Sequence, residues 1–391
     1  MPRANAFQIK PFSDEFRYEL ETGFCISCEL FQITSNPSPE SMFNSEYPFY
    51  TSSSQRMIEH FHRLVEEEIL SKSKSGAKVL EIGCNDGSLL SFVKNQNMTY
   101  LGIDPSESAV KRAQEQQIKV KLGFFNELTA DEIRKELGFA DFIVATNVVC
   151  HIPNIIQFFQ NVFETLSENG FFIFEEPYLG EMIQICSFDQ IYDEHIYMFS
   201  VSSIKKLLKK VGLELIDVKP QTTHGGSMRY VARKIGISEP TGNVNALLTY
   251  EETLGLSKIE TYRLFADECE LKSRQLKDLL VSLRNVGEKV YGYGATSKST
   301  TLLNFADISS DLVIAISDST SDKVGKYTPG TNIPVISPAR LRELEPDYVI
   351  IFAWNHFQEI LEKETLFKTS KTKIISLVPN VAVLEMNKEN A

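Results

Sequence analysis

The chain has 391 residues, 42% of them hydrophobic and 24% charged, which is typical of a globular protein with two or three domains. Its net charge of −12 and pI near 5.2 argue against a nucleic-acid-binding surface, and no apolar run is long enough to span a bilayer. Six scattered cysteines and the lack of a secretory signal pattern favour a reducing cytoplasm.

The hydrophobic pattern predicts four segments. They are a small N-terminal domain (1–54), an α/β domain (55–235), a helical connector (236–284, with its charged helical stretch at Leu247–Arg284) and a second, smaller α/β domain (285–391). A helix is expected over Ser54–Leu70, followed by strands at Val79–Ile82, Tyr100–Ile103, Lys119–Leu122, Phe142–Ala145, Gly170–Glu175, Leu213–Val218 and Met228–Ala232. Further strands are expected at Val290–Gly292, Leu312–Ser317, Tyr348–Phe352 and Lys373–Ser376. This alternation predicts two Rossmann-like halves with mostly parallel sheets, and no repeat in the sequence is strong enough to indicate a duplication.

The stretch Val79–Gly87 predicts a nucleoside site. An apolar strand leads into a glycine turn, where Gly83 permits close approach of a ligand and Gly87 opens the next helix. Asp104 ends the following strand, where a carboxylate can bind ribose hydroxyls. The spacing is not G-x-G-x-x-G, so a dinucleotide is disfavoured, and the alternative is a turn without a ligand. The pattern resembles motif I of S-adenosylmethionine (SAM) methyltransferases, which implies that Glu81 and Asn85 also contact SAM.

Two later loops extend this prediction. After the third strand, Phe125, or its neighbour Phe124, could form an apolar wall for adenine beside Asn126, although adjacent phenylalanines are more often core residues. After the fourth strand, Asn147 is a candidate cofactor contact. His151 is a candidate substrate contact or, alternatively, a turn-stabilising residue.

The segment Gln190–Tyr197 has the residues needed for proton transfer. His195 suits a general base because an ordinary imidazole titrates near neutral pH. Glu194 could orient that imidazole, and Tyr192 could donate to a developing oxyanion. The alternative is a surface helix start with a charged cap.

Substrate-binding residues are predicted at several turns of the chain. His224 and Arg229 flank a Gly-Gly-Ser turn that could approach a ligand closely. In the C-terminal half, the turn from Gly292 through Gly294 to Lys298 follows a strand and opens a helix, an arrangement that favours a phosphate. Three further candidates also lie at strand ends: Asp318, Trp354 and Asn355.

Cys25 and Cys28 have the spacing of half a zinc site. A structural zinc needs four ligands, and the sequence has no second C-x-x-C pair. We therefore expect less than one full equivalent of zinc.

Taken in order, these motifs resemble the three-domain sugar C-methyltransferases over nearly the whole chain. The resemblance rests on Val79–Gly87, Gly102–Pro105, His151–Pro153, Tyr192–His195, His224–Arg229, Gly292–Lys298, Pro329–Gly330 and Trp354–Asn355, and on the 47–54 segment with its Tyr-Pro-Phe-Tyr start. It implies proton-transfer roles for Tyr192, Glu194, His195 and His151, and a substrate contact from Tyr47 or Tyr50. It also implies a C-terminal domain that helps to hold a nucleotide sugar, and an N-terminal domain of zinc-binding type that is degenerate here.

The resemblance predicts a SAM-dependent C-methyltransferase acting on a nucleotide-linked, typically dTDP-linked, 4-keto-deoxysugar. His195 would remove the proton next to the ketone, and the enolate would take the methyl group. The alternatives are an O- or N-methyltransferase acting on a sugar or nucleoside, and a non-catalytic SAM- or nucleotide-binding module. A cytoplasmic monomer or weak homo-oligomer is expected, with no nucleic-acid or membrane partner.

Overall fold

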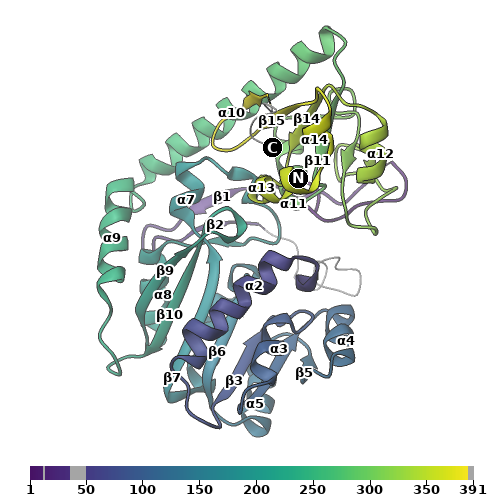
Figure 1. Ribbon diagram of the computed structural model, residues 1–391. Coiled ribbons are helices and arrows are strands. Elements are labelled where there is room, and N and C mark those ends of the chain that lie inside the picture. Colours follow the sequence, from purple (N-terminus) through teal and green to yellow (C-terminus); the bar gives the residue numbers. More distant parts are fainter. Residues whose placement is uncertain (12–13, 36–49, 386–391) are drawn as a thin grey trace.

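The computed structural model describes residues 1–11, 14–35 and 50–385, which form two α/β halves joined by a helical connector (Figure 1). The larger half contains a seven-stranded sheet in the order β5-β4-β3-β6-β7-β10-β9. Its strands are β3 (Lys78–Ile82), β4 (Thr99–Asp104), β5 (Val120–Leu122), β6 (Ala140–Thr146), β7 (Leu166–Pro177), β9 (Leu213–Gln221) and β10 (Ser227–Lys234). Strands β3 to β7 are parallel, so their carboxyl ends meet at the edge where open α/β sheets bind ligands.

Helices cover this sheet, and the first of them begins at a side-chain cap. Ser54 accepts a hydrogen bond from the backbone N–H of Met57, which begins the helix that lies across the sheet (Figure 1). The predicted helix over Ser54–Leu70 is confirmed as α2 followed by a π-helical turn, η2. The elements are η1 (Thr51–Ser53), α2 (Gln55–Leu64), η2 (Val65–Leu70), α3 (Ser88–Lys94), α4 (Glu107–Glu115), α5 (Glu127–Glu136), η3 (Val149–His151), α6 (Ile155–Thr165), α7 (Leu179–Gln184), η4 (Phe188–Gln190), α8 (Val201–Lys210) and η5 (Thr223–Gly225).

The C-terminal half contains a second sheet, in the order β13-β12-β11-β14-β15-β16. Its strands are β11 (Val290–Tyr293), β12 (Ile316–Ser317), β13 (Val335–Ile336), β14 (Tyr348–Ile351), β15 (Lys373–Ser376) and β16 (Ala382–Leu384). Its helices are α11 (Ser297–Phe305), α12 (Pro338–Glu343), η6 (Trp354–His356), α13 (Phe357–Lys363) and α14 (Leu366–Thr369). The strands are parallel except β16, which confirms the second Rossmann-like half.

The connector between the halves is two helices, α9 (Gly242–Leu254) and α10 (Ile259–Asn285), where the sequence indicated one long helical stretch. Gly255 interrupts that stretch because its left-handed φ of 71° ends α9 as a C-cap. Helix α10 then runs along the top of the molecule to the C-terminal half (Figure 1).

A small antiparallel sheet was not predicted. It consists of β1 (Thr22–Phe24), β2 (Phe31–Ile33) and β8 (Tyr197–Met198), and these strands are too short to show a period in the sequence. Phe24 and Phe31 stack on Tyr262 of α10, which fixes the N-terminal segment against the connector. No helix in the described part of the chain is long and apolar enough to cross a membrane.

Candidate active site

A single large cavity, of about 1280 Å³, brings together most of the predicted site residues. Its walls come from the loops after β3, β4 and β6 in the larger half. They also come from the Tyr192–His195 segment and from the loops after β11 and β12 in the C-terminal half. The carboxyl ends of the parallel strands of both sheets therefore face one shared space.

The loop after β3 depends on glycine at position 83. Gly83 has a φ of 70°, and a Cβ there would lie 2.2 Å from a methyl group of Val148. Gly83 and Asn85 line the cavity as predicted. Gly87 does not: it precedes α3 with a φ of 78° and packs against Ile118, so it shapes the turn.

Two carboxylates at this end of the cavity are arranged to receive a cation and hydroxyl groups. Asp104 accepts the backbone N–H groups of Asn85 and Ser106, at 2.9 and 2.8 Å. Burial raises the pKa of Asp104. Glu81 is buried, and its Oε2 has no hydrogen-bond partner among the described residues.

The surroundings of Glu81 fit the ammonium group of SAM. Burial raises the pKa of Glu81 well above its usual range, and Asp104 and Asp86 raise it further. A cation at this position would supply the missing partner and offset the crowding of negative charge. Glu81 could therefore hold the methionine ammonium, and Asp104 could hold the ribose hydroxyls.

The adenine end of the predicted site also lines the cavity. Phe125 is buried and packs edge-on against Phe158, with ring centroids 5.8 Å apart, while Phe124 is partly exposed. Asn126 lines the same wall, but its side-chain oxygen accepts the N–H of Thr129 and caps α5. Both phenylalanines line the cavity, and Phe125 also belongs to the hydrophobic core.

The segment before α2 covers the loop after β3, residues 83–87, which we call the cofactor loop. The N–H groups of Thr51 and Ser52 donate to the side chains of Asn85 and Asp86, at 3.0 and 2.9 Å. Tyr50 lines the cavity with the guanidinium of Arg112 3.4 Å from its ring centroid. Tyr47 lies outside the described residues, so the choice between Tyr47 and Tyr50 stays open.

We expect Asp104→Ala to weaken SAM binding by about 1–3 kcal/mol, because a charge-assisted pair of hydrogen bonds is lost. Titration calorimetry of the folded variant measures this loss. Asp278→Ala, at an exposed position on α10, is the control and should bind SAM like the wild type. An unchanged affinity in Asp104→Ala would remove Asp104 from the site.

The tautomer of His195 is fixed by its neighbours. Its Nδ1 lies 2.7 Å from the backbone oxygen of Gln190, which can only accept, so Nδ1 carries the proton. Its Nε2 therefore accepts the hydroxyl of Tyr192, at 2.8 Å. The expectation of a near-neutral imidazole is wrong here. Burial lowers the pKa of His195 well below its usual range, and the nearby charges of His151 and Lys298 add to the effect.

His151 and Glu194 both line the cavity beside His195, and the Glu194 side chain has a partner that the sequence did not indicate. His151 Nδ1 donates to the backbone oxygen of Glu194, and the His151 and His195 rings lie 5.3 Å apart. The Glu194 carboxylate accepts the side chain of Asn5, at 2.6 Å. The predicted orienting contact to His195 is instead made by the Gln190 carbonyl, which a sequence pattern cannot reveal.

Glu176 is a positioning residue that the sequence did not indicate. It follows Glu175 near the end of β7, and its Oε1 accepts the backbone N–H groups of Val148 and Val149, at 3.0 and 2.7 Å. These bonds fix the loop that carries Asn147 and His151. The only available signal was a pair of acids at the end of an apolar strand.

The turn that carries His224 lies against the C-terminal half. His224 has a φ of 54°, and its Nε2 is 3.1 Å from the amide nitrogen of Asn147, so these two predicted contacts are neighbours in the cavity. A Cβ on Gly225 would lie 2.1 Å from the ring of Trp354. Burial, with added effect from Lys298, lowers the pKa of His224 to about 3.

Trp354 joins the two halves and does not line the cavity. Its indole N–H donates to Asp189 on η4, at 2.7 Å, whereas its neighbour Asn355 does face the cavity. Lys298 lies near this contact, with its ammonium 5.9 Å from the Trp354 ring centroid. Burial lowers the pKa of Lys298, and the charge of Asp189 raises it.

Gly294 in the loop after β11 and Lys298 at the start of α11 line the cavity, as does Asp318 after β12. Gly292 does not. It is buried within β11, where a Cβ would lie 2.5 Å from the ring of Phe352, so it serves packing between the strand and its neighbour.

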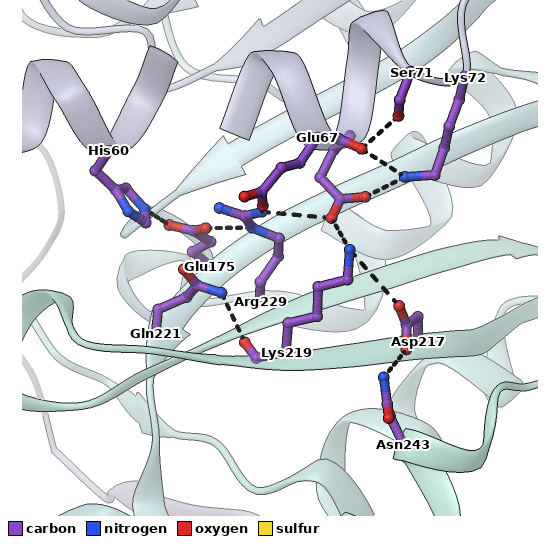
Figure 2. Close-up of polar contacts among 11 residues, drawn as sticks. His60, Glu67, Ser71, Lys72, Glu175, Asp217, Lys219, Gln221, Arg229 and Asn243 are labelled. Carbon is purple, nitrogen blue, oxygen red and sulfur yellow. Dashed lines mark hydrogen bonds and ion pairs between the residues drawn. The ribbon is translucent and has the colours of Figure 1, made fainter. Parts of the chain in front are cut away.

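Arg229 is also placed away from the cavity, contrary to the prediction. It lies in a cluster of charged residues (Figure 2). Side chains alternate along β10, and Arg229 points to the face covered by α2 and η2. There it pairs with Glu175 at 2.6 Å, Glu67 at 2.8 Å and Glu68 at 3.4 Å. His60 completes this buried cluster through a 2.6 Å contact with Glu175. Arg229 is therefore a structural residue.

Cys25 and Cys28 lie in the turn between β1 and β2, where Cys25 O accepts the N–H of Glu29. In the described part of the chain, no histidine, cysteine or acidic residue forms a group of three possible metal ligands with them. A half-site for zinc stays a prediction.

Two protein families match this chain. Residues 53–218 match a methyltransferase domain, and residues 222–379 match the C-methyltransferase C-terminal domain. The chain is 29% identical to the C-methyltransferase NovU of Streptomyces niveus over 374 residues, which cover 95% of this chain and 88% of that protein. It is 27% identical over 184 residues to the carboxy-S-adenosyl-L-methionine synthase of Campylobacter concisus, covering 46% of this chain and 75% of that one.

Solved structures also resemble part of the chain. A SAM-dependent methyltransferase from Archaeoglobus fulgidus covers 45% of this chain and 94% of its own, with 16% identity and a TM-score of 0.37. Magnesium protoporphyrin IX methyltransferase from Synechocystis, with bound SAM, covers 45% of this chain and 79% of its own, with 16% identity and a TM-score of 0.36.

Proposed function

We propose that this chain, a SAM-dependent C-methyltransferase similar to NovU, methylates the carbon next to the ketone of a nucleotide-linked 4-keto-deoxysugar, with dTDP as the first nucleotide to test. The observation that carries the proposal is the Tyr192–His195 pair. It offers an unprotonated imidazole nitrogen and a phenol donor inside the cavity that the cofactor loop and the C-terminal half share.

Methylation at carbon requires a base for a weakly acidic C–H bond and a donor for the enolate oxygen. The lowered pKa of His195 keeps its Nε2 free of a proton at neutral pH, so this nitrogen can accept the substrate proton. The Tyr192 hydroxyl can then turn from Nε2 to the enolate oxygen. SAM, when bound, supplies the electrophilic methyl group.

Lys298 supports the same chemistry electrostatically. Its positive charge lowers the pKa of both His195 and His224, so the potential in this part of the cavity favours a developing negative charge. The carboxylate of Asp189 opposes the effect of burial on Lys298 and helps the ammonium to stay charged. The sequence-based prediction of a phosphate contact for Lys298 remains compatible with this position.

Solvent exchange tests the proposal. The enzyme, a dTDP-linked 4-keto-6-deoxyhexose and S-adenosylhomocysteine are incubated in D₂O, where methyl transfer cannot occur. We expect deuterium to enter the carbon next to the ketone, because proton removal precedes methylation, and mass spectrometry measures it. A sample without enzyme corrects for spontaneous exchange.

The alternatives give a different result. With SAM present, an O- or N-methyltransferase would transfer the methyl group without catalysing exchange at carbon. A non-catalytic binding module would do neither. Either outcome would contradict carbon methylation.

A further inference from the structure

The two halves of the chain carry the same carboxylate at the same structural position. In the larger half, Gly83 N–H donates to Ile103 O, at 2.8 Å, and Asp104 follows. In the C-terminal half, Gly294 N–H donates to Ser317 O, at 2.7 Å, and Asp318 follows. Both glycines have a positive φ, of 70° and 93°, and both aspartates are 7% exposed.

The hydrogen bonds of the two aspartates also correspond. Asp104 accepts Asn85 N–H from the glycine turn and Ser106 N–H two residues ahead, at 2.9 and 2.8 Å. Asp318 accepts Ala295 N–H from its glycine turn and Thr320 N–H two residues ahead, both at 2.8 Å. In each case the carboxylate is held rigidly at the edge of one shared cavity.

The two sites differ in charge at one equivalent position. Glu81 pairs with Gly102 two residues before Asp104, and Gly292 pairs with Ile316 two residues before Asp318. Where the first site has the buried carboxylate of Glu81, the second therefore has a glycine. The C-terminal site thus lacks the group that fits an amino-acid ammonium, so it is not a second SAM site.

Two lysines lie near the glycine turn of the C-terminal half. Lys298 and Lys323 both line the cavity beside this loop, and Lys323 donates to Ala295 O, at 2.8 Å. The backbone N–H groups at the start of α11 lie in the same loop. The first site is acidic and suits a cationic nucleoside, whereas the second combines a hydroxyl-binding carboxylate with positive charge.

We infer that Asp318 binds the furanose hydroxyls of a nucleoside diphosphate, in the manner that Asp104 fits the ribose of SAM, with the 3′-hydroxyl as the shared contact for ribose and deoxyribose. This rests on the proposed function, because it assigns the nucleotide part of that substrate to the loops after β11 and β12. Asp318 would then hold the nucleoside in the C-terminal half, while the sugar reaches towards His195.

Calorimetry on the full chain tests the assignment. dTDP, UDP and GDP are titrated first, and the tightest binder is compared with its 3′-deoxy analogue. We expect loss of the 3′-hydroxyl to weaken binding by about ten- to a hundredfold, the usual effect of a hydrogen bond to a charged group. Asp318→Asn should bind the parent nucleotide more weakly than the wild type does, by a similar factor. It should bind the 3′-deoxy analogue no more weakly than the parent nucleotide, and its affinity for SAM should be unchanged. Asp307→Asn, exposed in the same half, is the matched control.

The outcomes separate the two proposals. If the wild type binds the nucleotide and its 3′-deoxy analogue equally well, Asp318 does not hold the furanose. This result does not depend on whether the variant folds. If none of the three nucleotides binds the wild type, the nucleotide-sugar function itself fails. The assignment would also be overturned if removal of the 3′-hydroxyl weakened binding equally in Asp318→Asn and in the wild type.

Discussion

His195→Ala is expected to slow carbon methylation and solvent exchange together by about 10²–10⁴-fold, with SAM binding retained. The reason is that His195 Nε2 is the acceptor of the Tyr192–His195 pair, and His195 lines the cavity together with the candidate substrate-binding residues. Deuterium exchange by mass spectrometry and methyl transfer from labelled SAM measure the two rates, and calorimetry measures SAM binding.

Matched variants separate this role from a general effect of losing a histidine. His62→Ala removes an exposed imidazole from α2 and should leave both rates unchanged. Tyr192→Phe keeps the ring and removes only the donor, so it should slow enolate formation less than His195→Ala does. Wild-type exchange in His195→Ala would place the base elsewhere, and His151 would be the next candidate.

The pH profile gives a second check on His195. A base acts only when it is unprotonated, and burial together with the charges of His151 and Lys298 lowers the pKa of His195 well below its usual range. Activity should therefore stay flat as the pH falls through about 6.5, the ordinary histidine value, and decline only below it. An acid limb at the ordinary value would contradict the buried, neutral imidazole.

The parts of the site that could be predicted are local in sequence. Val79–Gly87 and Asp104 belong to one βαβ unit, where glycine and an acid at strand ends carry their own geometric meaning. Lys298 and Asp318 follow the same rule in the second half. The alternation of strands and helices predicted the two mostly parallel sheets because it too is a local pattern.

The missing parts depend on contacts between distant segments. Gln190 fixes His195 through a backbone oxygen, which no side-chain pattern encodes. Asn5 reaches Glu194 only because the N-terminal segment folds back over the site. Arg229 looked like a ligand contact beside Gly225–Gly226, but alternation along β10 turns it to the opposite face of the sheet, towards Glu175.

Arg229→Met is expected to lower the free energy of unfolding of the larger half by about 3–5 kcal/mol. Arg229 is 1% exposed, and its loss removes the cation that the buried carboxylates of Glu175 and Glu68 share (Figure 2). Glu68 keeps its contacts with Lys72 and Lys219, so the uncompensated charge falls mainly on Glu175. Urea unfolding followed by circular dichroism measures the change, while the fluorescence of the single Trp354 reports on the contact between the halves. Arg263→Met, at an exposed site with only a 4.0 Å contact to Glu260, should change stability by less than about 0.5 kcal/mol.

The pH dependence identifies the unpaired charge as the cause. Burial raises the pKa of Glu175, but His60 and Arg229 outweigh it and hold this pKa below the usual value, so in the wild type its stabilising effect is present at neutral pH and lost as the pH falls through the lowered pKa. In Arg229→Met the effect of burial is no longer opposed by the guanidinium, so the pKa of Glu175 rises. Protonation then removes the buried charge at a higher pH than in the wild type. The stability deficit should therefore narrow as the pH falls towards about 4, and Glu175→Gln added to Arg229→Met should recover part of it at neutral pH. A deficit that is constant with pH would mean that lost packing, and not the buried carboxylate, accounts for the effect of Arg229.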